Sequence, residues 1–207
     1  MLSDIHYRLH LDVPADEEAD IPATLAVRFT LAEPGQPLQL DFREDADHLH
    51  AVSANGKTIA VHFEAEHLVI PADALRAGPN ELAIDFTAGS SSLNRNPDYL
   101  YTLFVPDRAR TAFPLFDQPD LRASYELSLE LPGAWTAMAG TAQKLREARG
   151  ERVYYAFEAS EKISSYLFSF VAGRFDTVTR EVGGRPMTLI HRETDQAKLT
   201  RNLDDIF

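Results

Sequence analysis

The chain has 207 residues, no cysteine, and 20 lysine and arginine residues against 32 aspartate and glutamate residues, a net charge of -12. This acidic balance argues against binding nucleic acid or an anionic membrane through a basic face. The lack of cysteine excludes a disulfide framework, a thiolate metal site and a cysteine nucleophile. No apolar run approaches the about 18 residues of a membrane span. No signal peptide opens the sequence, which favours the cytoplasm but leaves the compartment open.

The first half of the chain alternates apolar and polar residues with the period of two that half-buried strands require. The pattern is clear in residues 7–13 and 24–31, and short strand-like runs follow at 37–42, 57–63, 67–70 and 81–86. Asn55 and Gly56 predict a two-residue hairpin turn, because both tolerate positive φ angles. We therefore expect antiparallel pairing.

Strand-like segments continue through the second half at residues 123–131, 152–159, 164–175, 176–182 and 186–193. The segments after residue 152 are rich in aromatics and alternate less strictly, which is typical of a sheet covered on both faces. Gly150 and the Gly183-Gly184 pair indicate two further hairpin turns. Together these patterns predict an all-β fold, an antiparallel β-sandwich or saddle of about a dozen strands.

Two short segments have helical rather than strand character. Residues 71–78 begin with proline and end with glycine, which predicts a connector helix of one or two turns. From Thr194 the period changes and places Leu199, Leu203 and Ile206 on one helical face behind a threonine or aspartate cap. We expect a β domain over residues 1–193, and over 194–207 the start of a linker helix leading to a catalytic domain that is absent from this chain.

No catalytic motif is visible in the sequence. None of the seven histidines begins an H-E-x-x-H pair, and there is no G-x-S-x-G elbow, phosphate-binding loop or dinucleotide fingerprint. His48 and His50 share a short segment but lack a third ligand, and the acidic positions are interpreted as a solvated face: Asp41, Glu44, Asp45 and Asp47. We predict no catalytic residue, no metal ligand and no cofactor in this chain.

Residues 110–119 follow neither period. They combine Phe113 and Phe116 with two prolines around Asp117 and Gln118. Exposed aromatics at this density are costly, so we expect a buried corner. In it, Arg110 and Asp117 pair or hydrogen-bond turn backbone, and Gln118 bonds backbone.

Residues 99–140 resemble the N-terminal domain of the aminopeptidase N family of zinc metallopeptidases. Seven residues carry the family's arginine, Phe-Pro and Phe-Asp-x-Pro signature, with Trp135 on its usual strand: Arg110, Phe113, Pro114, Phe116, Asp117, Pro119 and Leu121. Residues 162–178 and 6–13 are similar to further strands of the family. The resemblance covers nearly the whole chain.

The resemblance implies a saddle-shaped β domain placed before a thermolysin-like catalytic domain. In the family, that second domain holds Zn²⁺ through two histidines and a glutamate and hydrolyses the N-terminal residue from peptides. This chain contains neither H-E-x-x-H nor the family's G-x-M-E-N strand. It should therefore be inactive alone, with its own downstream catalytic domain as its partner and a peptide as the substrate of the parent enzyme.

The resemblance also implies a loop that reaches the cleft and helps to bind the substrate's α-amino group. Family members carry Gln, and two residues later Glu or Gln, just after the threonine that Thr102 matches. Here the two positions hold Leu103 and Val105. Neither side chain accepts a hydrogen bond from an amine, so these cleft-facing positions depart from the family's pattern.

Two other classes of function stay open at this level. A stand-alone module that binds peptides or carbohydrates would need an exposed aromatic row, for example Tyr99, Tyr101 and Tyr154. An independent enzyme would need two carboxylates that converge in one pocket. For the isolated domain, we predict concentration-dependent association through an apolar face near residues 103–116 and through the stripe of the last helix.

Overall fold

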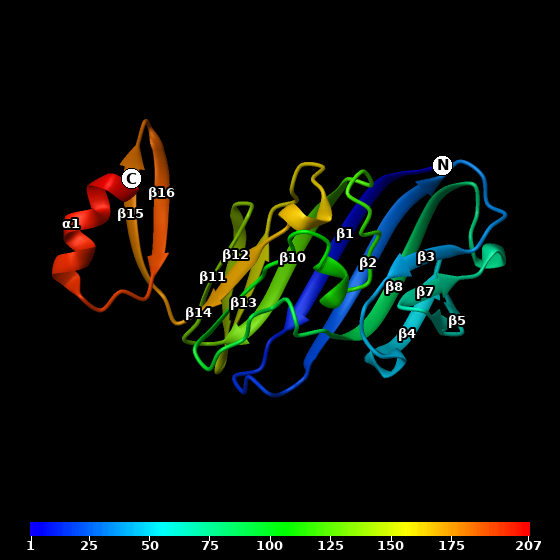
Figure 1. Ribbon diagram of the computed structural model, residues 1–207, viewed down its shortest axis with the longest axis horizontal. Coiled ribbons are helices and arrows are strands. Elements are labelled where there is room, and N and C mark those ends of the chain that lie inside the picture. Colours follow the sequence, from blue (N-terminus) through cyan, green and yellow to red (C-terminus); the bar gives the residue numbers. More distant parts are fainter.

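Eight strands form one curved sheet across the middle of the computed structural model, which describes residues 1–207 (Figure 1). Along each central strand the apolar side chains face one side and are buried, as the period of two predicts. In spatial order the strands are β12 (Gln143–Arg149), β13 (Arg152–Phe157), β10 (Ala123–Pro132), β1 (Leu2–Asp12), β2 (Ile21–Leu31), β8 (Gly78–Ala88), β4 (Leu49–Ala54) and β5 (Lys57–Ile59).

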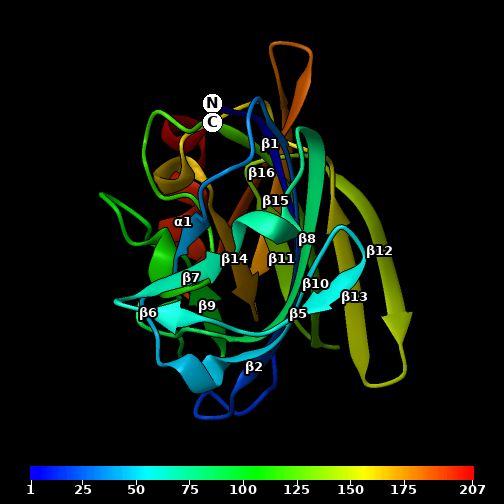
Figure 2. The ribbon, with the colours of Figure 1, turned by 90° about the vertical axis from the view of Figure 1, so that its right-hand side faces the viewer.

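Two three-stranded sheets form the second layer and lie on one side of the large sheet (Figure 2). The first contains β11 (Thr136–Ala139), β14 (Phe170–Gly173) and β9 (Tyr99–Tyr101), and the second contains β3 (Leu38–Asp41), β7 (His67–Ile70) and β6 (Phe63–Glu64). One hydrophobic cluster fills the space between the layers. The predicted all-β sandwich is confirmed, with sixteen strands rather than about a dozen.

Turns and single-turn helices connect these strands. Asn55 and Gly56 adopt φ angles of 52° and 78° and close the predicted hairpin between β4 and β5. The predicted connector helix is the 3₁₀ helix η2 (Ala72–Ala74). The other three 3₁₀ helices are η1 (Ala46–His48), η3 (Ala109–Thr111) and η4 (Ser165–Leu167).

One strand pair departs from the expected antiparallel arrangement. β1 and β10 are parallel neighbours at the centre of the large sheet. On their outer face His6 Nδ1 lies 2.8 Å from Ser124 Oγ and His10 Nδ1 lies 2.9 Å from Ser128 Oγ. Local turn signals do not reveal a pairing between segments this far apart in the sequence, since it depends on the whole fold.

The last part of the chain stands apart from the sandwich (Figure 1). It contains β15 (Asp176–Val182), β16 (Arg185–His191) and α1 (Gln196–Ile206), and its two strands pair only with each other. Most residues of the hairpin are exposed or half-buried, so the expectation that these two strands are covered on both faces was wrong. No helix of the structure has the length and apolar character needed to cross a membrane.

α1 begins behind the predicted aspartate cap and lies beside β15. Asp195 accepts a hydrogen bond from the backbone amide of Lys198, and Arg180 of β15 pairs with Asp204 of α1. Leu199 and Leu203 are buried, whereas Ile206 is exposed. The stripe that we expected to be free is therefore largely covered within this chain.

Candidate functional site

A buried carboxylate, Asp41 at the end of β3, organises the corner segment, defined as residues 110–119. The main chain of Asp41 exchanges two hydrogen bonds with Leu115. Its Oδ2 accepts from the amide of Asp117 and from Nε2 of Gln118, each at 3.0 Å, and its Oδ1 lies 3.2 Å from His67 Nε2. The expectation that the side chain of Gln118 bonds backbone was wrong, because its amide nitrogen donates to the carboxylate of Asp41.

Asp117, the signature aspartate, is also buried and accepts two hydrogen bonds. Its Oδ2 accepts from the backbone amide of Arg110 at 3.2 Å, and its Oδ1 accepts from the hydroxyl of Ser165 at 2.5 Å. The guanidinium of Arg110 instead pairs with Asp107 at 3.2 Å. Of the two alternatives predicted for Arg110 and Asp117, the structure shows the backbone bond.

The environment of Asp117 disfavours its charged form. Burial raises the pKa of Asp117, the hydrogen bonds from Ser165 and Arg110 oppose that rise, and the negative charge of Asp41 adds to it. The carboxyl group thus serves as a buried structural acceptor, not as a solvated acid.

The aromatic residues of the corner pack into the core under the large sheet. Phe113 makes edge contacts with Tyr7, Phe104 and Phe168, at ring-centroid distances of 6.4, 6.0 and 6.0 Å. Tyr7 is fully buried on β1, and its hydroxyl accepts the amide of Phe116 at 2.9 Å. At the end of the corner, the hydroxyl of Ser164 donates to the carbonyl of Pro119, and Pro114 is buried beside Phe113.

The segment just before the corner has the opposite character. Leu103 and Val105 are 47% and 54% exposed, while Phe104 between them is buried against Phe168. Leu167 of η4 is 55% exposed. β9 and β14 are antiparallel, with Tyr101 opposite Val171, and the stacking of Phe104 on Phe168 brings the segment of Leu103 and Val105 next to that of Leu167. We call Leu103, Val105 and Leu167 the apolar ridge.

The backbone holds the ridge in place. The amide and the hydroxyl of Thr102 both donate to the carbonyl of Phe170, and the amide of Phe170 donates back to that hydroxyl. The amide of Leu103 donates to the carbonyl of Ser92, and that of Arg108 to the carbonyl of Phe104. These bonds fix the backbone from Thr102 to Phe104, next to the exposed side chains of the ridge.

The other candidate groups do not converge on one site. Tyr99 and Tyr101 stack on β9, whereas Tyr154 lies on β13 in the large sheet under Arg149, whose guanidinium carbon is 4.0 Å from the ring centroid. These three tyrosines do not form the row that a carbohydrate-binding face would need. His48 and His50 both lie at hydrogen-bond distance from Thr87.

The residues of this chain do not fit a zinc site. No group of three or more histidine, cysteine, aspartate or glutamate side chains is placed to hold a metal ion. We therefore assign no step of a zinc-dependent reaction to residues of this chain.

Sequence reasoning missed three groups that build the corner: Asp41, Tyr7 and Ser165. Asp41 was assigned to a solvated acidic face, and this was wrong, because its side chain is only 9% exposed. Each of the three lies at least 48 positions from its partner in the corner, so no local spacing reveals the contact. The one available signal was that a buried aspartate needs hydrogen-bond partners.

Comparison with known proteins gives one consistent family. The model of the Peptidase M1 N-terminal domain family matches residues 3–167. Over 191 residues the chain is 29% identical to "Probable M1 family aminopeptidase 1" of Encephalitozoon cuniculi, covering 84% of this chain and 22% of that protein. It is 31% identical over 186 residues to Aminopeptidase N of Streptomyces lividans, covering 83% and 21%.

A human relative matches almost the whole chain. Identity to Glutamyl aminopeptidase of Homo sapiens is 26% over 235 residues, covering 98% of this chain and 24% of that protein. The chain thus spans between a fifth and a quarter of the length of these relatives. The family match includes the whole corner and the whole ridge, and confirms the resemblance seen in the motif. The chain belongs to the Peptidase M1 N-terminal domain family, the N-terminal domain of aminopeptidase N-like enzymes.

Proposed function

We propose that this chain is the non-catalytic front domain of an aminopeptidase N-like zinc metallopeptidase and that its apolar ridge flanks the catalytic cleft of the downstream domain. The observation that carries the proposal is an exposed apolar ridge of Leu103, Val105 and Leu167 beside a corner whose aromatics are buried. An exposed apolar surface of this kind is typical of a contact site. In the proposed parent, Zn²⁺ belongs to the downstream domain, and the substrate is a peptide with a free N-terminus.

The chemistry of the ridge limits what it does for such a substrate. An ammonium group that leaves water needs a carboxylate or an amide oxygen in place of its hydration. Leu103 and Val105 offer neither through their side chains. In the proposed parent, the catalytic domain alone anchors the α-amino group, and the ridge contacts apolar parts of the peptide or of the downstream domain.

The division into a β domain over residues 1–193 and a linker from 194 stays a prediction. The β15–β16 hairpin shares no sheet with the sandwich, so it and α1 together form the connection in the proposed parent. Arg192 lies just after β16. Its guanidinium is 3.2 Å from the carboxylate of Asp98 and lies over the ring of Tyr99. A cytoplasmic location likewise stays a proposal.

A labelled parent enzyme tests the position of the ridge. Because this chain has no cysteine, Val105→Cys introduces a single attachment point in it for an environment-sensitive dye. Leu145→Cys is the matched control, since Leu145 is 46% exposed on β12. We expect peptide binding to the zinc-loaded parent to change the emission at position 105 and not at position 145. Equal responses, or none at position 105, would contradict the proposal.

A further inference from the structure

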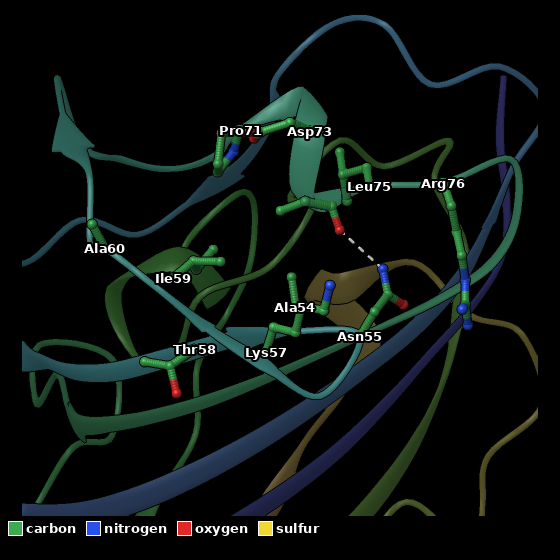
Figure 3. Close-up of a pocket in the computed structure, with 11 residues that line it drawn as sticks. Ala54, Asn55, Lys57, Thr58, Ile59, Ala60, Pro71, Asp73, Leu75 and Arg76 are labelled. Atoms are coloured by element: carbon green, nitrogen blue, oxygen red, sulfur yellow. Dashed lines mark hydrogen bonds between the residues drawn. The ribbon is translucent and has the colours of Figure 1, made fainter.

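A cavity lies between the β4–β5 hairpin and η2 (Figure 3), at the opposite end of the molecule from α1 (Figure 1). Its volume is about 520 Å³. Ala54 and Leu75 in its lining are buried, and Ile59 is half-buried. A cavity of this size with apolar walls and a few polar groups is typical of a ligand-binding site.

Two asparagines fix the walls of this cavity. Asn55 Nδ2 donates to the carbonyl of Ala74 and to Asn80 Oδ1, each at 3.0 Å, and so joins the hairpin turn to η2 (Figure 3). Asn80 is buried and also bonds both backbone groups of Arg76. A pocket with walls tied together in this way needs little ordering when it binds a ligand.

One wall of the cavity is an open strand edge. β5 is the last strand of the large sheet and pairs only with β4. In a two-residue hairpin the residues next to the turn, Ala54 and Lys57, exchange hydrogen bonds, so the following pair, Ser53 and Thr58, does not. Thr58 therefore directs its amide and carbonyl away from β4, as strand addition requires.

The rim carries positive charge in a chain with a net charge of -12. Lys57 and Arg76 line the cavity, and neither forms a salt bridge. The Nε of Arg76 donates to the carbonyl of Pro79, which leaves its terminal nitrogens free of any protein partner. Asp73 is the only acidic residue in the lining, so the rim favours an anionic ligand.

We propose that this cavity binds an extended, acidic peptide segment of a partner protein. The segment adds as a strand to the free edge of β5, places an apolar side chain against Ile59 and Leu75, and directs carboxylates toward Lys57 and Arg76. This site is distinct from the apolar ridge and independent of the function proposed above.

The probe is a fluorescent peptide of alternating glutamate and leucine, titrated into the 207-residue chain at low and high salt, with an otherwise identical glutamine-for-glutamate peptide as its control. We expect saturable binding that weakens at least tenfold with the glutamine peptide and with Lys57→Glu. Thr58→Pro removes the free amide at an edge position that tolerates proline and should abolish binding. Amide chemical shifts should change in residues 57–60 and 71–76.

Lys144→Glu is the matched charge control, because Lys144 is exposed on β12 at the other edge of the sheet. It should bind the acidic peptide as the unchanged chain does, and thermal unfolding shows whether each variant is folded. The proposal is overturned if no peptide binds, if Lys57→Glu and Lys144→Glu weaken binding equally, or if the shifts lie outside the cavity. Self-association that Lys57→Glu abolishes would overturn it in favour of a second copy of this chain as the occupant.

Discussion

The corner segment and the apolar ridge are neighbours in the sequence and have opposite surroundings. Between Arg110 and Pro119 the aromatics are buried, and the carboxylate of Asp117 accepts hydrogen bonds from the amide of Arg110 and the hydroxyl of Ser165 in η4. A few residues earlier, Leu103 and Val105 face solvent, and the backbone of Val105 makes no hydrogen bond within the chain. The residues of the family's signature thus stabilise the fold, whereas the residues exposed for contact lie just outside the signature.

This difference separates two kinds of sequence change. A change at the buried residues of the corner should act on folding, since their side chains pack in the core or bond buried groups. A change in the ridge should leave folding intact and act on what the domain contacts.

The largest effect is expected for Phe113→Ala. The ring contacts three other aromatics in the core, and removing a buried phenylalanine typically costs about 3–5 kcal/mol. Urea unfolding followed by tryptophan fluorescence measures the loss. Leu103→Ala is the ridge counterpart and should change the free energy of unfolding by no more than about 0.5 kcal/mol. Similar losses for both variants would break the distinction between corner and ridge.

Asp41→Ala should come next, with a loss of about 2–3 kcal/mol. The substitution leaves the buried amide of Asp117 without an acceptor and frees Gln118 and His67. Asp45→Ala is a suitable control, because Asp45 lies nearby and makes no side-chain cap bond to η1. If both variants unfold at the same urea concentration, Asp41 does not organise the corner.

Asp117 should give a pH dependence with a defined sign. Burial raises its folded pKa above the ordinary value of 3.8, so between these two pKa values the folded state binds more protons than the unfolded state. Its contribution to stability is therefore fully present below pH 3.8 and is lost as pH rises through the folded pKa.

The measurement for Asp117 is the difference in free energy of unfolding between the unchanged chain and Asp117→Asn, followed from low pH upward. As pH rises through that window, the free energy of unfolding of the unchanged chain should fall relative to that of Asp117→Asn. The contribution of the other carboxylates to the pH dependence cancels in this difference, because they titrate in both proteins. A difference that does not vary with pH, or varies with the opposite sign, would show that hydrogen bonds outweigh burial at this site.

The smallest effect on folding is expected for the ridge double variant Leu103→Gln with Val105→Glu. Its unfolding should match that of the unchanged chain to within about 0.5 kcal/mol. Sedimentation should show weaker self-association than in the unchanged chain, because the polar side chains interrupt the apolar patch. Leu145→Gln, at an exposed apolar position on β12, should not alter association. A monomeric unchanged chain at high concentration would contradict the predicted association.

Local sequence patterns predicted the features that local chemistry controls. Alternation located the central strands β1, β2, β8 and β10 of the large sheet but not β4 or β12, Asn55 and Gly56 located a hairpin turn, and Asp195 capped the last helix. The parallel pairing of β1 with β10 was not predictable in this way, because hydrogen-bond geometry between distant segments depends on the assembled sheet.

The candidate site shows the same limit. The aromatics of the corner predicted a segment that needs burial, but nothing near Gln118 indicated that its partner is Asp41. Leu103 and Val105 were located only through the family's pattern, and Leu167 was not predicted at all. The outward direction of Leu103 and Val105 goes with the inward Phe104 between them. The exposed β15–β16 hairpin was misjudged because its apolar residues look like those of a covered sheet.

The central claim is that the ridge is a contact surface for a downstream catalytic domain. Hydroxyl-radical footprinting of the parent enzyme and of the 207-residue chain, read out by mass spectrometry, compares the side-chain exposure of Leu103, Val105 and Leu167 in both. We predict strong protection of all three in the parent, with Leu145 on β12 equally reactive in both proteins. Equal reactivity of the ridge in the two proteins would contradict the claim.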